Sequence, residues 1–232
     1  MSDCASPAPL ETVELQTGPQ PQAGVVWLHG VGADGHHFEY LVDQFTRRGD
    51  PPLRFVFPHA PVRAVTLCGG ERMRAWYDLR NVDRQIDQDE TAIRASFDAI
   101  SALIERERQR GVRSDRLVLG GFSQGGAMAL FTGTRCAQPL AGLIAVSCYR
   151  LLASSFARER QAANRNTPIF LAHGSADPVV PPSAAQDTRR QLESAGYRVE
   201  WHGYPVGHEL CAPELADLTS FVRRVLSLDS AL

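Results

Sequence analysis

The chain has 232 residues, of which 44% are hydrophobic and 22% charged, enough to bury one substantial core. Its 24 basic residues nearly balance 26 acidic ones, and the formal net charge of -2 argues against a nucleic-acid partner. All 24 basic residues are Arg. The absence of Lys excludes mechanisms that need a lysine amine, such as Schiff-base catalysis or a Walker A loop.

The N-terminal segment and the cysteines indicate a cellular compartment. Residues 1–22 carry four prolines and lack the basic cluster and apolar run of a signal peptide. No stretch approaches the roughly 18 apolar residues of a membrane span. The five cysteines are odd in number, far apart and without C-x-x-C spacing, so neither a disulfide framework nor a zinc site is predicted. We expect a cytoplasmic protein without stable membrane insertion, and the sequence leaves a homo-oligomer open.

Beyond Gln22, short apolar runs alternate with longer amphipathic stretches, a pattern typical of an α/β protein with a mostly parallel central sheet and helices on both faces. A weaker strand is expected over 11–16 at a sheet edge, because polar and apolar residues alternate there. The other elements are expected, in chain order, as strand 25–29, helix 37–47, strand 54–58, helix 89–110, strand 116–120, helix 125–135, strands 140–147 and 168–173, helix 183–195, strand 198–204 and helix 213–226. We interpret 1–22 as an N-terminal segment that is partly the edge strand, and 23–232 as one domain.

Two long connections, 59–88 and 147–167, interrupt this alternation. Long connections in a compact α/β domain usually carry function or form a pocket wall. The first connection contains Trp76, for which two roles stay open. A large aromatic side chain is more often part of the core, and the alternative is contact with substrate.

The most informative motif is G-x-S-x-G at 121–125, which follows an apolar run and precedes a predicted helix. Both glycines are needed because the serine lies in a sharp strand-to-helix turn, where side chains would collide with neighbouring backbone. This turn lifts the hydroxyl of Ser123 above the sheet, and the free N–H groups of the helix start face the place where an oxyanion would form. An incidental serine at a glycine-rich helix entrance is the alternative, which the flanking strand and helix disfavour.

A serine nucleophile needs a general base and a group that orients the base. After such a turn the usual chain order is Ser, then an acid, then His. Asp177 follows an apolar strand directly, so its carboxylate can reach across the carboxyl edge of the sheet, whereas His173 precedes this acid and fits the order poorly. His202 lies within a predicted strand, but His208 follows that strand on a loop with a glycine. We therefore predict Ser123, Asp177 and His208 as the catalytic residues.

A second oxyanion donor is expected from the segment 27–32, which follows the first buried strand. Its glycines allow the backbone to turn an N–H toward the nucleophile. We predict Val31 and Gln124 as the two donors, each through its backbone N–H group.

A metal site is the alternative interpretation of the polar residues after this strand, namely His29, Asp34, His36 and His37. The adjacent histidines point different ways from a helix start, and no further carboxylate or histidine recurs at ligand spacing. We predict no metal, and the chemistry inferred above requires no organic cofactor.

Together these residues resemble the small carboxylesterase and acyl-protein thioesterase family of α/β-hydrolases, also described as phospholipase/carboxylesterase. The matching segments follow the family order over nearly the whole chain: W-L-H-G-V-G-A-D (27–34), F-P-H-A-P-V-R-A-V-T (57–66), M-R-A-W-Y-D (73–78), G-F-S-Q-G-G-A-M-A-L (121–130), H-G-S-A-D-P-V-V-P (173–181) and Y-P-V-G-H (204–208). The resemblance implies a single-domain α/β-hydrolase with its catalytic domain over 23–232. The site residues it implies are the triad Ser123, Asp177 and His208, the oxyanion pair Val31 and Gln124, and Trp76 near the acyl pocket.

The expected activity is that of a serine esterase, which hydrolyses small-molecule carboxylic esters of short to medium acyl chains through an acyl-enzyme, with thioesters as a further class. Acyl-protein thioesterase and lysophospholipase activity on the same triad are alternatives. A non-catalytic hydrolase-fold binding protein is another, because fold does not establish function, although the intact Ser, His and Asp set speaks against it.

One departure from the family pattern bears on the substrate. After A-V-S-C-Y the family usually turns with Leu-Pro, whereas this chain has Arg150-Leu151-Leu152. The rest of the segment up to Thr167 is also unlike the family. This loop is expected to shape the substrate mouth, so the natural acyl and leaving groups stay open.

Overall fold

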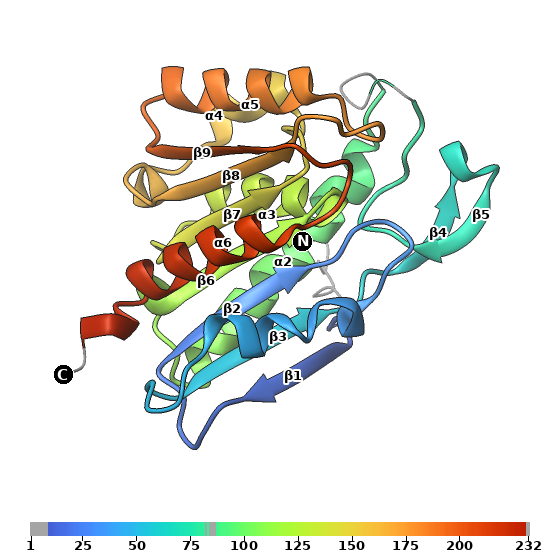
Figure 1. Cartoon of the computed structure of the whole chain (residues 1–232). Helices are drawn as coiled ribbons and strands as arrows, with labels where there is room; N and C mark the ends of the chain where they lie inside the picture. Colours follow the sequence, from blue (N-terminus) through green and yellow to red (C-terminus); the bar gives the residue numbers. More distant parts are fainter. Residues whose placement is uncertain (1–8, 82, 84–86, 231–232) are drawn as a thin grey trace.

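The computed structural model describes residues 9–81, 83 and 87–230. In this part of the chain, seven strands form one sheet in the order β1-β3-β2-β6-β7-β8-β9, and β1 alone runs antiparallel to its neighbour (Figure 1). The mostly parallel sheet that the sequence predicted is therefore confirmed. The strands are β1 (Thr12–Gln16), β2 (Ala23–Leu28), β3 (Leu53–Pro58), β6 (Leu117–Phe122), β7 (Gly142–Val146), β8 (Ile169–Gly174) and β9 (Val199–Tyr204).

The α-helices of the described residues are α1 (Leu41–Phe45), α2 (Glu90–Gln109), α3 (Gln124–Arg135), α4 (Phe156–Glu159), α5 (Pro182–Ser194) and α6 (Ala212–Val225). They cover both faces of the sheet because its inner strands are apolar on both sides. α1 and α6 share one core layer, with α6 in front of the sheet in Figure 1, and the other four share the opposite layer. No helix in the described ranges is long and apolar enough to cross a bilayer.

The structure differs from the sequence expectation in two places. The single helix expected over 37–47 is a 3-10 turn, Gly35–Phe38, followed by the short α1; the turn begins before residue 37 because the Asp34 carboxylate caps it by accepting the His36 N–H at 2.9 Å. The connection 59–88 contains an antiparallel hairpin of β4 (Val62–Val65) and β5 (Glu71–Arg74). Among the residues of its two strands only Val65 is buried, and three are arginine, so the hairpin lacks the buried apolar face that an alternating pattern indicates.

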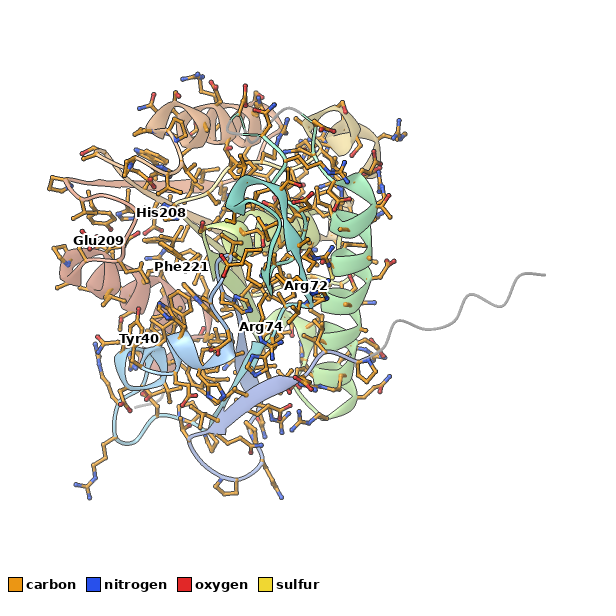
Figure 2. All side chains as sticks on the ribbon, turned by 90° about the vertical axis from the view of Figure 1, so that its right-hand side faces the viewer. Tyr40, Arg72, Arg74, His208, Glu209 and Phe221 are labelled. Atoms are coloured by element: carbon orange, nitrogen blue, oxygen red, sulfur yellow. The ribbon has the colours of Figure 1, made fainter. Side chains whose placement is uncertain are left out.

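The hairpin lies on the right-hand side of Figure 1, the side that faces the viewer in Figure 2, where Arg72 and Arg74 of β5 and also His208 are labelled. The second long connection, 147–167, contains α4 between two short 3-10 turns. Each of the two long connections therefore contains secondary structure of its own.

α2 packs on the sheet through an apolar stripe and one buried ion pair. Ile93, Ile100 and Ile104, at successive spacings of seven and four residues, are all buried. Near the helix end, Arg54 Nη1 of β3 donates a 2.8 Å hydrogen bond to Glu107 Oε2, and only 8% and 1% of the two side chains are exposed. Each charge is tolerated at this depth because the other compensates it.

We expect Glu107→Ala to lower the free energy of unfolding by about 3 kcal/mol, because it leaves the buried Arg54 guanidinium without this carboxylate. Urea unfolding followed by circular dichroism measures this change. Glu105→Ala is the matched control on the same helix, since Glu105 pairs with Arg108 at the exposed surface, where an ion pair contributes about 1 kcal/mol or less. Equal losses in the two variants would contradict the prediction.

Candidate active site

Ser123 lies at the sharp junction between β6 and α3. Its backbone has φ 56° and ψ -121°, a conformation that costs energy for a residue with a side chain. A Cβ on Gly121 would lie 2.5 Å from the backbone carbon of Gly125, and a Cβ on Gly125 would lie 2.1 Å from the carbonyl oxygen of Leu28. Both glycines are therefore required by backbone packing, which is the physical reason that the sequence analysis gave for them.

Ser123, His208 and Asp177 meet at the carboxyl edge of the sheet, although they are far apart in the chain. Ser123 follows β6, Asp177 follows β8, and His208 follows β9. His208 Nε2 is 2.9 Å from Ser123 Oγ, and His208 Nδ1 is 2.7 Å from Asp177 Oδ2. Because the carboxylate accepts a hydrogen bond, Nδ1 carries the proton in the tautomer that fits both contacts, and Nε2 is left to accept from the serine hydroxyl.

The two segments that carry the predicted oxyanion donors, the loop after β2 and the start of α3, both lie next to Ser123. The loop after β2 approaches the nucleophile closely, since a Cβ on Gly30 would be 3.3 Å from Ser123 Cβ. Gln124 is the first residue of α3, where a backbone N–H has no acceptor within the helix. Neither Val31 nor Gln124 donates its backbone N–H to an acceptor among the described residues. Both groups can therefore donate to a developing negative charge.

Comparison with known proteins identifies the family. The phospholipase/carboxylesterase family profile matches residues 11–226. The chain belongs to this family. It is 40% identical to acyl-protein thioesterase 1 of Neurospora crassa over 209 residues, which cover 86% of this chain and 85% of that protein. It is 35% identical over 216 residues to acyl-protein thioesterase 1 of Gibberella zeae, covering 89% and 92% of the two chains.

Solved structures agree with this membership. Arabidopsis thaliana SOBER1 matches 88% of this chain and 99% of its own at 28% identity, with a TM-score of 0.81. Zea mays acyl-protein thioesterase 2 matches 94% of this chain and 99% of its own at 25% identity, with a TM-score of 0.80. The predicted single-domain α/β-hydrolase fold is confirmed. As a member of the family the protein is a serine hydrolase of esters or thioesters, which confirms the expected class of activity.

Asp177 of this hydrolase is held rigidly. It is only 5% exposed, and its Oδ1 accepts the backbone N–H groups of Val179 at 2.8 Å and Val180 at 2.9 Å. His173, at the end of β8, donates from Nε2 to the Val180 carbonyl at 2.9 Å and lies 3.3 Å from Asp177 Oδ2. Burial lowers the pKa of His173, so this imidazole stays neutral and supports the turn that carries the acid. The chain order argued against His173 as a base, and no local pattern in the sequence indicated this supporting contact.

His202 lies apart from these residues, within β9. It contacts Glu200 Oε1 at 3.1 Å and Asp217 Oδ2 at 3.5 Å, and its ring stacks on Phe170 with the ring centres 4.5 Å apart. It lies within a strand, as the sequence predicted, and is half-buried there. The structure thus brings His208, and not His202, to Ser123.

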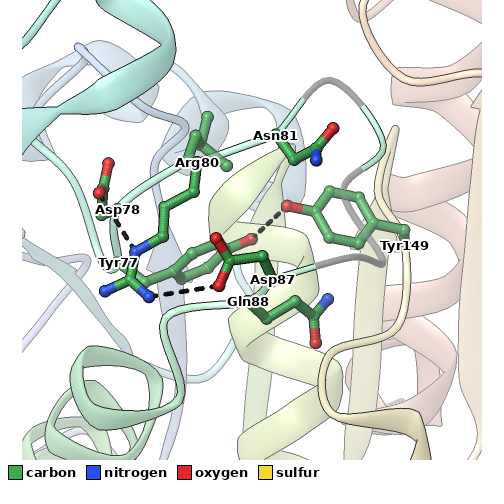
Figure 3. A pocket seen from close by; sticks show the side chains of 8 residues that line it. Tyr77, Asp78, Arg80, Asn81, Asp87, Gln88 and Tyr149 are labelled. Carbon is green, nitrogen blue, oxygen red and sulfur yellow. Dashed lines mark hydrogen bonds and ion pairs between the residues drawn. The ribbon is translucent and has the colours of Figure 1, made fainter.

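Trp76 is fully buried and belongs to the core layer that α2 and α3 form. Its ring lies beside His29, with the ring centres 5.4 Å apart. The residues that line the neighbouring pocket are Tyr77, Asp78, Leu79, Arg80, Asn81, Asp87, Gln88 and Tyr149 (Figure 3). The full burial of Trp76 and its contact with His29 favour core packing, and the role of Trp76 in an acyl pocket stays a prediction.

His29 is a buried, neutral histidine beside the predicted oxyanion loop. The backbone N–H of Ala60 donates to His29 Nε2 at 3.0 Å, so Nδ1 carries the proton and donates to the Gly30 carbonyl at 2.7 Å. Burial lowers the pKa of His29 to about 4, from an ordinary value near 6.5. A proton on Nε2 would displace the Ala60 N–H, which is a second reason for the neutral form.

The lowered pKa of His29 makes stability depend on pH. The contribution of His29 to the free energy of unfolding is full above about pH 6.5 and is lost as the pH falls toward 4. In this range the imidazole binds a proton in the unfolded chain but stays neutral in the folded one. The loss expected over the whole range is about 3 kcal/mol. Urea unfolding from pH 7 to pH 4 measures it.

His29→Gln should show a weaker dependence of unfolding free energy on pH than the wild type. His36→Gln is the control, because that side chain is 66% exposed and its removal should leave the dependence unchanged. The same pH dependence in the wild type and in His29→Gln would show that His29 does not titrate in this way.

Proposed function

We propose that the protein is a serine carboxylesterase whose catalytic triad is Ser123, His208 and Asp177. The observation that carries this proposal is the pair of contacts made by one imidazole, 2.9 Å to Ser123 Oγ and 2.7 Å to Asp177 Oδ2. These are the contacts that a general base needs with its nucleophile and with the acid that orients it. Esters of short to medium acyl chains are the proposed substrates.

In the proposed reaction, Ser123 Oγ attacks the ester carbonyl while His208 Nε2 takes the hydroxyl proton. The oxyanion of the tetrahedral intermediate accepts hydrogen bonds from the backbone N–H groups of Val31 and Gln124. His208 then returns the proton to the leaving alcohol, and the acyl group stays on Ser123. A water molecule, activated by the same imidazole, hydrolyses this acyl-enzyme and restores the serine.

An acyl-protein thioester is the second candidate substrate. The 40% identity to a protein named acyl-protein thioesterase 1, over 86% of this chain, favours it. The two candidates differ in leaving group and acyl length and share the same nucleophile. Initial rates on a panel of p-nitrophenyl esters and matched thioesters, with acyl chains of 2 to about 16 carbons, together with a palmitoylated peptide, distinguish them. Preference for the palmitoylated peptide over every small ester would make the thioesterase the better description.

We place the protein in the cytoplasm. Cys68, Cys136, Cys148 and Cys211 are free thiols, and Cys4 lies outside the described residues. Free thiols spread over a fold are compatible with a reducing compartment, in which disulfides rarely persist.

We expect a fluorophosphonate probe to label wild-type protein at Ser123, and Ser123→Ala to lose both the label and ester hydrolysis, with a fall in kcat on the order of 10⁴ or more. Mass spectrometry of the labelled peptide and initial rates on p-nitrophenyl butyrate measure the two effects. Circular dichroism should show that the variant is folded, because removal of one hydroxyl leaves no large cavity. A label on another serine would overturn the assignment, and a non-catalytic binding protein would show neither label nor turnover.

His208→Ala and His202→Ala form a matched pair of variants. His208→Ala removes the proposed base, so kcat should fall by roughly 10⁴-fold or more. His202→Ala removes a strand imidazole whose contacts are with Glu200, Asp217 and Phe170, so kcat should stay within about threefold of the wild type. Both variants should give wild-type circular dichroism spectra. The reverse order of activities would exclude His208 as the base.

A further inference from the structure

We infer that the side chains of Gln124, Trp76 and His29 form a buried frame that sets the spacing of the two oxyanion donors, so that all three are positioning residues of the reaction. This inference rests on the proposed function, because the donors matter only if Ser123 attacks a carbonyl. It assigns the Gln124 side chain a role separate from that of its backbone N–H, and it gives Trp76 a task other than lining an acyl pocket.

The Gln124 side chain is the first part of the frame. It is only 2% exposed, and both ends of its amide are engaged. Oε1 accepts the backbone N–H of Trp76 at 2.7 Å, and Nε2 donates to the carbonyl of Tyr77 at 2.8 Å. The residue whose backbone N–H is one proposed donor is therefore tied by its side chain to the segment that follows β5.

Trp76 connects this segment to the loop after β2. Its indole Nε1–H donates to the carbonyl of His29 at 2.9 Å, and its own carbonyl accepts from Ser96 Oγ of α2 at 2.5 Å. Every polar group of Trp76 is thus bonded to a different element, and the side chain is fully buried. A displacement of Trp76 would move the His29 carbonyl with it.

His29 carries the connection to the second donor. Its Nδ1–H donates to the Gly30 carbonyl at 2.7 Å. The peptide that joins Gly30 to Val31 is planar and trans, so a fixed Gly30 carbonyl also fixes the direction of the Val31 N–H on the opposite side. One residue further on, the Gly32 N–H donates to the Arg74 carbonyl of β5 at 2.9 Å. The Val31 peptide is held from both sides.

Three buried hydrogen bonds therefore connect one donor to the other, through His29, Trp76 and Gln124. Donors that are fixed before the reaction stabilise an oxyanion without reorganising, and an error of about 1 Å in their position can lower the rate by as much as 100-fold. None of the three side chains hydrogen-bonds to Ser123, His208 or Asp177. Damage to the frame should weaken the oxyanion contacts and leave the base intact.

Gln124→Met and Trp76→Phe test the frame. The first variant keeps the side-chain length and the backbone N–H but removes both amide bonds, and the second keeps an aromatic ring but removes the bond to the His29 carbonyl. We expect kcat on p-nitrophenyl butyrate to fall by about 10- to 100-fold in each, with KM within about threefold. If Gln124→Met does not fold, Trp76→Phe carries the same test.

Two readouts separate positioning from simple stability. A trifluoromethyl ketone forms a hemiketal oxyanion with the nucleophilic serine, so its inhibition constant should rise by the factor by which kcat/KM falls. The acidic limb of the kcat/KM profile against pH should stay where it is in the wild type, because His208 is untouched. Thr167→Val is the control: it also removes a buried side-chain donor, a hydroxyl within reach of Asn164 Oδ1 at 2.9 Å and of Leu140 O at 3.2 Å, but just before the amino end of β8, the end opposite the site.

The inference is overturned if Gln124→Met and Trp76→Phe lose no more kcat than Thr167→Val, or if their affinity for the inhibitor is unchanged while kcat falls. It is also overturned if the KM of Trp76→Phe, relative to that of the wild type, rises with acyl length, which would mean that Trp76 lines the acyl pocket. Failure of the proposed function gives a different result. In that case the wild type is neither labelled by a fluorophosphonate nor active on any ester, and the variants have no activity to lose.

Discussion

The start of α3 approaches the end of β2 so closely that no side chain fits between them. A Cβ on Gly125 would lie 2.1 Å from the Leu28 carbonyl oxygen and 2.6 Å from that of His29. Because Val31 follows β2 and Gln124 begins α3, this contact sets how far apart the two proposed donors can be. It also holds Ser123 in a backbone conformation that few residues adopt, and the cost is offset by the buried helix behind it.

Histidines at this edge of the sheet have different properties because their surroundings differ. His29 and His173 are buried, which lowers the pKa of each; His29 holds backbone groups through both ring nitrogens and His173 holds one through Nε2. His208 retains some exposure and has a hydroxyl on one side and a carboxylate on the other. Burial and partners, more than residue type, thus separate supporting imidazoles from the proposed base.

The pocket beside the core shows how the long connections are built into the fold. Tyr77 and Tyr149, one from each connection, meet through their hydroxyl groups at 2.8 Å (Figure 3). Arg80 lies among carboxylates of its own connection, 3.4 Å from Asp78 and 3.6 Å from Asp87. The two segments that depart from the regular alternation are therefore in contact with each other. Both connections therefore supply side chains to the wall of this pocket.

The sequence alone determined the strands of the parallel sheet and the serine turn, and it has Ser123, Asp177 and His208 in the chain order that the proposed triad needs. These features follow from local patterns. Glycine spacing indicates where two backbone segments approach closely, and apolar periodicity indicates which face of a helix or strand is buried. The short α1, the hairpin of β4 and β5 and the contacts of Trp76 were decided by tertiary structure. Trp76 forms hydrogen bonds with residues 47, 48 and 20 positions away in the chain. No local sequence pattern predicts which group a buried indole or amide will hydrogen-bond.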